Sequence, residues 1–158
     1  MLLKTLGEDS LIESLKRFGG SRGRLLKGIG DDTSVSVQKG GLALLATTDI
    51  LIEGVHFKTK NTPAYLLGRK ALSVSLSDIA AMGGEPLIFL VSLALSPDTP
   101  KKFIDELYRG LDAVAREAGC KLAGGNVAKT PGPIMVSTTV MGEAAAGEVV
   151  YRKGARTG

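Results

Sequence analysis

Two segments of the chain carry apolar residues at helical spacing and are bounded by the same residues. Residues 62–84 begin with Thr62-Pro63 and end with Gly83-Gly84, whereas residues 99–119 begin with Thr99-Pro100 and end with Gly119. Proline suits the first helical position, and glycine readily takes the left-handed conformation that ends a helix. Two amphipathic helices are therefore predicted, with Thr62 as the N-cap of the first. Their apolar faces are formed by Leu67, Ala71, Leu72, Leu76, Ile79 and Ala80, and by Phe103, Leu107, Leu111, Val114 and Ala118.

The segments around these helices have the composition of strands. Residues 35–38 and 42–48 flank two glycines, which favour a tight hairpin, and Asp49 is expected just beyond the second strand. Residues 87–95 and 134–140 are also predicted strands. A short helix is expected before Gly19-Gly20, followed by a loop over residues 19–27 that could serve as a phosphate-facing lid, and residues 142–147 form a small-residue segment.

Helices and strands in this order predict an α+β fold, an α/β sandwich in which helices cover one face of a mixed sheet. A chain of 158 residues fits one domain, residues 1–158. Few helices remain to cover the other sheet face, so we expect a second copy of the chain to bury it in a homodimer.

Composition argues against several classes of function. The net charge is +4 without a long basic run, aromatic residues are 4% of the chain and tryptophan is absent, which disfavours nucleic-acid binding. The single cysteine, Cys120, cannot form an intrachain disulfide. Residues 87–95 are far shorter than the roughly 20 residues of a membrane helix, and no secretion signal is recognisable. We therefore expect a cytoplasmic protein that binds neither membrane nor nucleic acid.

Acidic residues among small residues are the main chemical signal. Asp31 and Asp32 lie in Gly28-Ile-Gly-Asp-Asp-Thr, Asp49 follows two threonines, and Asp78 lies on an apolar helix beside Ser75 and Ser77. Carboxylate and hydroxyl oxygens are the ligands that Mg²⁺ prefers. Each aspartate, taken singly, could instead form a turn, cap an element or face water, so spacing alone leaves both interpretations open.

Glycines and cations give weaker signals. Gly28, Gly30, Gly124 and Gly125 are predicted at strand ends, where exposed amides can bind phosphate. Neither glycine pair completes a dinucleotide fingerprint or a P-loop. His56, Arg152 and Lys153 could bind an anionic substrate, but they could equally be ordinary solvated side chains.

Four motifs in order carry a family resemblance. They are Gly28-Ile-Gly-Asp-Asp, Thr47-Thr-Asp-Ile-Leu-Ile-Glu-Gly-Val-His-Phe, Arg69-Lys-Ala-Leu-Ser-Val-Ser-Leu-Ser-Asp-Ile-Ala-Ala-Met-Gly-Gly-Glu-Pro and Leu122-Ala-Gly-Gly-Asn. The chain resembles the amino-terminal domain of the thiamine-monophosphate kinase family, within the aminoimidazole ribonucleotide synthetase-like superfamily. The resemblance implies direct transfer of the ATP γ-phosphoryl group to thiamine monophosphate with Mg²⁺, giving thiamine diphosphate, in a homodimer whose sheets pair.

The resemblance also assigns roles to individual residues. It implies that Mg²⁺ is held by Asp32, Thr47, Thr48, Asp49 and Asp78, and that the substrate phosphate contacts His56. It implies that ATP contacts Tyr108 at the base, Gly125 and Asn126 at the phosphates, and Arg152.

Two departures from the family pattern set the alternatives. Asn126 stands where the family has an aspartate, which puts a metal ligand there in doubt. Members of the family have a further carboxy-terminal domain, which is expected to be absent from this chain, so the isolated domain is expected to be inactive. Another ATP-using enzyme of the superfamily, or a non-catalytic dimerisation or nucleotide-sensing module, remains the alternative.

Overall fold

Both segments bounded by proline and glycine are helices in the computed structural model, which describes residues 3–154. Helix α3 spans Ala64–Ala81 and helix α4 spans Lys101–Ala118. Helix α4 ends at Gly119 in the left-handed conformation, with φ of 74°, which confirms the predicted stop. The predicted N-cap of α3 is wrong, because Pro63 takes that position and no side chain caps the helix. The ends of the predicted domain, residues 1–2 and 155–158, lie outside the described residues.

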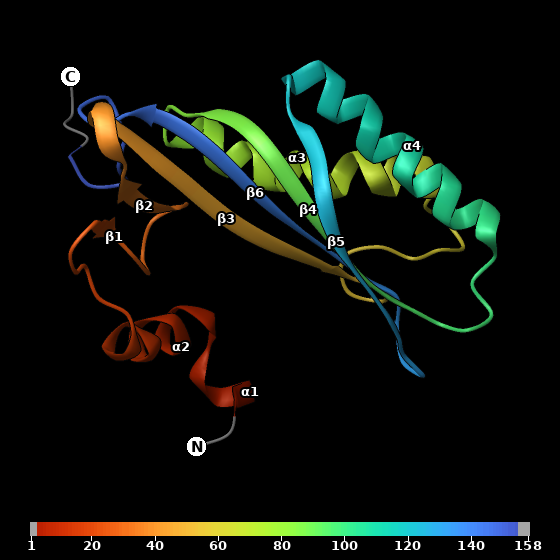
Figure 1. Cartoon of the computed structure of the whole chain (residues 1–158). Helices are drawn as coiled ribbons and strands as arrows, with labels where there is room; N and C mark the ends of the chain where they lie inside the picture. Colours follow the sequence, from red (N-terminus) through yellow and green to blue (C-terminus); the bar gives the residue numbers. More distant parts are fainter. Residues whose placement is uncertain (1–2, 155–158) are drawn as a thin grey trace.

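The strands form one mixed six-stranded sheet in the order β1-β2-β3-β6-β4-β5 (Figure 1). Strands β4 and β5 are parallel, and the other neighbours are antiparallel. The strands are β1 (Leu25–Lys27), β2 (Ser34–Val37), β3 (Leu42–Ile52), β4 (Glu85–Leu95), β5 (Lys121–Lys129) and β6 (Met135–Ala145). The remaining elements are α1 (Leu3–Leu6), α2 (Glu8–Leu15), and the 3₁₀ turns η1 (Lys16–Phe18) and η2 (Lys39–Gly41).

Several predicted boundaries are wrong because pairing with β6 extends the strands. Strand β3 continues to Ile52, so Asp49 lies inside the strand and pairs with Thr138 instead of following the strand end. Strand β6 runs on to Ala145, so most of the small-residue segment is strand. The loop predicted over residues 19–27 also contains the short strand β1.

The course of strand β5 was not predicted, because the sequence indicated only a strand end at Gly124 and Gly125. Its glycines are disfavoured in strands, and every residue of this edge strand is exposed, so no apolar alternation marks it. Gly124 and Gly125 therefore lie within a strand rather than at a strand end. A Cβ on Gly125 would lie 1.8 Å from the carbonyl oxygen of Val91, so glycine is what allows β5 to approach β4.

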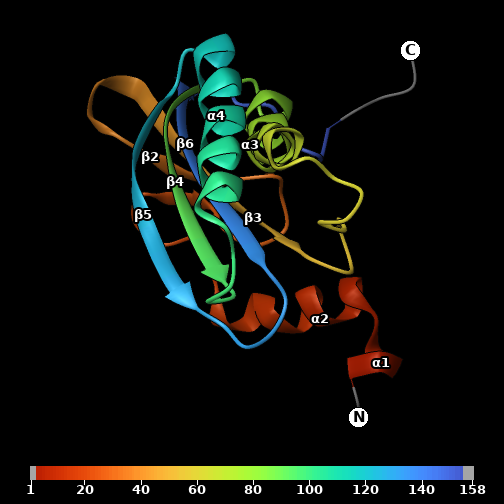
Figure 2. The ribbon, with the colours of Figure 1, turned by 90° about the vertical axis from the view of Figure 1, so that its right-hand side faces the viewer.

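Helices α3 and α4 cover one face of the sheet, and α1 and α2 lie beyond one end of it (Figure 2). The core between helices and sheet includes the fully buried side chains of Leu72, Phe89, Leu107 and Val140. No described helix covers the opposite face, where Ile50 is 48% exposed. The predicted one-sided α+β architecture is confirmed, whereas pairing of the open face in a homodimer stays a prediction.

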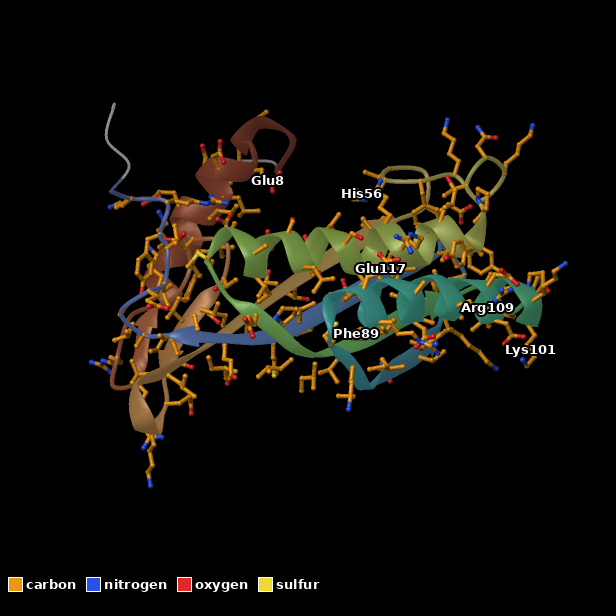
Figure 3. The ribbon with its side chains drawn as sticks, turned by 90° about the horizontal axis from the view of Figure 1, so that it is seen from above. Glu8, His56, Phe89, Lys101, Arg109 and Glu117 are labelled. Atoms are coloured by element: carbon orange, nitrogen blue, oxygen red, sulfur yellow. The ribbon has the colours of Figure 1, made fainter. Side chains whose placement is uncertain are left out.

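Two glycines set the distance between α3 and α4. A Cβ on Gly68 would lie 2.0 Å from the carbonyl oxygen of Leu107, and one on Gly110 would lie 2.0 Å from that of Tyr65. The helix backbones therefore touch directly. At the far end of the contact, the Arg69 guanidinium donates two hydrogen bonds, of 2.8 and 2.9 Å, to Glu117, which lies between the helices in Figure 3.

Replacing Gly68 by alanine should destabilise the protein by about 1–3 kcal/mol, because the added methyl group forces the two helix backbones apart. Chemical denaturation of Gly68→Ala measures the loss. Gly147→Ala is the matched control, since Gly147 has no neighbour within 4 Å of its Cβ position and should change stability by less than about 0.5 kcal/mol. Equal effects of the two variants would contradict the close helix contact.

Candidate functional site

Strand β3 directs two of the predicted site residues toward α3. Side chains alternate along a strand, so Thr47 and Asp49 face the helix while Thr48 faces the open side. The Thr47 hydroxyl donates a hydrogen bond of 2.7 Å to Asp78 of α3. The Ser75 hydroxyl, one helical turn earlier, donates one of 2.7 Å to Asp49. The interface between β3 and α3 therefore holds two carboxylates side by side.

The loop between β1 and β2 brings two more carboxylates to this place. Asp31 has no exposed side-chain surface, pairs with Lys27 at 3.2 Å and accepts a hydrogen bond of 3.1 Å from the backbone N–H of Arg152. Burial opposes ionisation of Asp31, but the hydrogen bonds from Arg152 and Lys27 outweigh it and lower its pKa. Asp31 is thus a structural anchor, and Asp32 beside it faces the cleft.

Arg152 meets Asp32 directly. Its Nε donates to Asp32 Oδ1 at 3.0 Å, and its Nη2 contacts the same oxygen. Arg152 therefore lies at the predicted acidic site, where it pairs with a carboxylate.

The charges of the site are not balanced. Burial raises the pKa of Asp78, and the nearby negative charges of Asp49 and Asp32 raise it further, against the opposing effects of Thr47 and Arg152. A carboxyl group whose pKa is raised by folding lowers the stability of the protein when it is charged. The site therefore favours the arrival of positive charge.

A cleft of about 360 Å³ opens beside these residues and is lined by Gly28, Asp32, Thr33, Thr47 and Thr48. The Thr33 hydroxyl is buried there without a hydrogen-bond partner. Carboxylate and hydroxyl oxygens are suitable donors for Mg²⁺. Among the described residues, no three acidic, histidine or cysteine side chains converge tightly enough to hold a metal ion. The donor chemistry fits Mg²⁺, and oxygens of a bound phosphate would have to complete its coordination.

His56 lies on the turn that follows β3, on the side of α3 away from α4 (Figure 3). Its Nδ1 accepts a hydrogen bond of 3.0 Å from the N–H of Ile52, and its carbonyl oxygen accepts one of 2.8 Å from Lys70. Because Nδ1 is an acceptor, the neutral ring carries its proton on Nε2. The exposed edge of His56 is therefore a hydrogen-bond donor suited to an anionic ligand.

Tyr108, Gly125 and Asn126 form a second group at the other edge of the sheet. Tyr108 lines a largely apolar cavity of about 590 Å³ between α4 and β5, together with Phe89 and Cys120. Burial raises the pKa of the Tyr108 hydroxyl. Asn126 pairs with Ser92 and lies on the open face of the sheet.

The structure joins some predicted site residues and separates others. It brings together Asp32, Thr47, Asp49, Asp78 and Arg152, and Thr48 lines the same cleft from the opposite side of β3. Asp49 and Gly125 lie in one cross-strand row, with Thr138 of β6 and Val91 of β4 between them. Three strand spacings, roughly 14 Å, therefore separate the acidic group from the second group.

Three supporting residues were not predicted. Ser75 is fully buried and bonds both Asp49 and Thr138, so it orients the carboxylate rather than leaving room for a ligand. Lys27 holds Asp31. A buried serine on an apolar helix, three residues before an aspartate, is the signal that could have identified Ser75. Thr138 and Lys27 become recognisable only from strand pairing and loop geometry.

A protein-family model described as "AIR synthase related protein, N-terminal domain" matches residues 30–144, more than half of the chain. The thiamine-monophosphate kinase of Aquifex aeolicus is 39% identical over the whole chain, which covers 48% of that protein. The thiamine-monophosphate kinase of Synechococcus elongatus is 32% identical over 99% of the chain, which covers 46% of that protein. The chain thus spans about half the length of these relatives.

Solved structures show the same fold. The structure described as "AaThiL complexed with AMPPCP and TMP" superposes with a TM-score of 0.89 at 39% identity, covering all of this chain and 48% of that one. Thermotoga maritima PurL in complex with ADP superposes with a TM-score of 0.67 at 18% identity, covering 85% of this chain and 22% of that one, which shows the fold alone. Within residues 3–154, no helix has the length and apolar character to cross a membrane.

Asp78→Asn should raise the melting temperature at pH 7. Because folding raises the pKa of Asp78 above its ordinary value, its charge costs stability once the pH exceeds that value, and the cost is absent at lower pH. Asparagine retains an acceptor for Thr47 and removes the charge. The gain should disappear below about pH 4, where the carboxyl is neutral in both states. A gain that persisted unchanged in acid would contradict this electrostatic origin.

Proposed function

The chain belongs to the family of N-terminal domains of AIR synthase related proteins, and on this basis we propose a function for it. We propose that it supplies the metal- and nucleotide-binding half of a thiamine-monophosphate kinase. The reaction is transfer of the ATP γ-phosphoryl group to the phosphate of thiamine monophosphate, giving thiamine diphosphate and ADP in the cytoplasm. The observation that carries the proposal is a loose acidic group. Asp32 lines the cleft together with Thr47 and Thr48, and the carboxylates of Asp49 and Asp78 lie near it, held by hydroxyl groups at the interface between β3 and α3. The relatives from Synechococcus elongatus and Aquifex aeolicus are thiamine-monophosphate kinases, which supports this proposal.

Both substrates of this reaction are anions, and their mutual repulsion is the main obstacle to bringing them together. Mg²⁺ held by Asp32, Asp49 and Asp78, with the hydroxyl of Thr47, would neutralise charge on the transferring phosphoryl group. The Thr48 hydroxyl is turned to the open face, where it bonds Thr138 and Thr139, so the metal role of Thr48 stays a prediction from the family resemblance. The protein residues orient these ligands. Ser75 fixes one oxygen of Asp49, and Thr47 fixes one oxygen of Asp78, which leaves the second oxygen of each carboxylate available.

Substrate recognition is assigned to His56, on the turn that follows β3 and outside the cleft lining. Its exposed Nε2–H is a donor that suits the phosphate of thiamine monophosphate. At the β5 edge of the sheet, the apolar cavity beside Tyr108 suits a purine base, and Gly125 and Asn126 lie further along β5, beyond the part of this strand that lines the cavity. Asn126 offers an amide oxygen without charge, so this position contributes less to metal binding than a carboxylate would.

Two observations support a homodimer. The open face carries partly exposed apolar residues, with Leu42 41% exposed, Ile50 48% exposed and Ile88 37% exposed. Moreover, strands β6 and β4 separate the acidic group at β3 from the Tyr108 cavity at β5, so the two parts of the proposed site do not meet within one chain. A second copy on the open face would bury the apolar residues and would bring its own residues close to the site.

A charge on the open face should separate the copies. Ile50→Asp is expected to convert a dimer to a monomer in light scattering coupled to size-exclusion chromatography, because the buried carboxylate would lack a partner. Leu66→Asp is the matched control, since Leu66 is 52% exposed on α3 and lies outside the open face. Dimers of both variants would refute this interface.

Titration calorimetry with a non-hydrolysable ATP analogue tests the site itself. The 158-residue chain should bind the analogue more tightly with Mg²⁺ than without it. The ratio of these two affinities should be at least tenfold smaller in Asp49→Asn, because asparagine carries no negative charge to hold the metal ion. Thiamine monophosphate should then bind, whereas formylglycinamidine ribonucleotide should not. If the chain preferred the ribonucleotide, the proposed kinase function would be wrong, and another ATP-using activity of the superfamily would be indicated.

A further inference from the structure

The acidic site already contains a positively charged group of the protein itself, the side chain of Arg152. The guanidinium of Arg152 makes both of its contacts to a single oxygen, Asp32 Oδ1. The Arg152 side chain is 64% exposed, whereas the Asp32 side chain is 21% exposed. The pair is therefore open to water on the arginine side, where a guanidinium can leave without crossing packed protein.

The backbone around Arg152 is fixed independently of this ion pair. Val149 is buried, the N–H of Val150 donates a hydrogen bond of 3.0 Å to the carbonyl oxygen of Met82, and the N–H of Arg152 donates one of 3.1 Å to Asp31. Asp31 is itself held by Lys27. The segment thus stays attached at Met82 and Asp31 when the guanidinium moves, and only the side chain has to turn.

The position of Arg152 gives it an electrostatic role beyond Asp32. Its positive charge also acts on Asp78 and opposes the effect of the neighbouring carboxylates there. No other basic side chain among the described residues forms an ion pair with Asp32, Asp49 or Asp78. A divalent cation entering this group would carry twice the charge and would compete with Arg152 for the oxygens of Asp32.

We propose that Arg152 is a resident counter-ion that occupies Asp32 until a divalent cation displaces it, and that the released guanidinium then binds the phosphates of the nucleotide. The inference rests on the proposed function, because it takes the acidic group as the site of the cation. The exchange couples two events. Cation binding frees a planar, permanently charged donor next to the cleft, and such a donor binds phosphate in a bidentate manner.

Arg152→Gln and Lys153→Gln form a matched pair for the test. Both remove one positive charge from adjacent exposed residues, but only Arg152 contacts Asp32. Mn²⁺ serves as the probe, and the free ion is counted by electron paramagnetic resonance without nucleotide. Arg152→Gln should tighten Mn²⁺ binding about 2- to 5-fold relative to Lys153→Gln, the range expected for loss of a competing exposed ion pair.

A second measurement follows the released side chain. With Mn²⁺ present, Arg152→Gln should bind the ATP analogue more weakly than Lys153→Gln, because the freed donor is missing. Arg152→Lys retains the charge without the planar fork, so its affinity for Mn²⁺ should lie between those of the wild type and Arg152→Gln. Circular dichroism and melting temperature confirm that each variant is folded.

The outcomes separate this inference from the proposed function. Equal Mn²⁺ affinity in the two glutamine variants, with binding that Asp49→Asn abolishes, would overturn the exchange and leave the metal site standing. Weaker Mn²⁺ binding by Arg152→Gln than by Lys153→Gln would also overturn it, since the arginine would then assist the cation. Absence of Mn²⁺ binding in the wild type and in both glutamine variants would overturn the exchange together with the proposed metal site.

Discussion

The hydroxyl of Ser75 links the elements on which the acidic site depends. It donates to Asp49 at 2.7 Å and lies 2.8 Å from the Thr138 hydroxyl, which in turn donates to the carbonyl oxygen of Ala71 at 2.8 Å. This buried network connects β3, β6 and α3. A buried polar network specifies one arrangement because each group that loses its partner costs free energy. It fixes the register of α3 against the sheet, and that register places Asp78 beside Thr47.

The same network explains why the site is electrostatically costly. A helix that packs on a sheet usually presents apolar side chains, yet α3 presents Ser75 and Asp78 at the point where β3 presents Thr47 and Asp49. The raised pKa of Asp78 shows that folding disfavours its charge. Carboxyl groups with perturbed pKa values cluster at functional sites, so this shift agrees with the functional interpretation that rests on the neighbouring acids and hydroxyls.

The sequence predicted the parts of the fold that local chemistry determines. The ends of α3 and α4 follow from proline and glycine, and the strands with apolar runs were recognised. Strand β5 was missed because its stability comes from pairing with β4 and from the space that Gly125 leaves, and neither is visible in its own residues. For the same reason, the spacing of the acids could not show that Asp32 and Asp49 lie near Asp78, or that Tyr108 lies across the sheet from them.

Strand order therefore decides how the site is divided. Strands β6 and β4 lie between β3 and β5, so the sheet holds the acids of its interior apart from the Tyr108 cavity at its β5 edge. No rotation of side chains can close a separation of roughly 14 Å across the paired strands. A nucleotide that contacts both groups therefore has to extend across the width of two strands, along the sheet, and cannot be enclosed at one point of it. Arg152 differs from the other residues predicted to bind the nucleotide, because its backbone N–H bonds Asp31 and its guanidinium bonds Asp32, which places it among the predicted metal ligands.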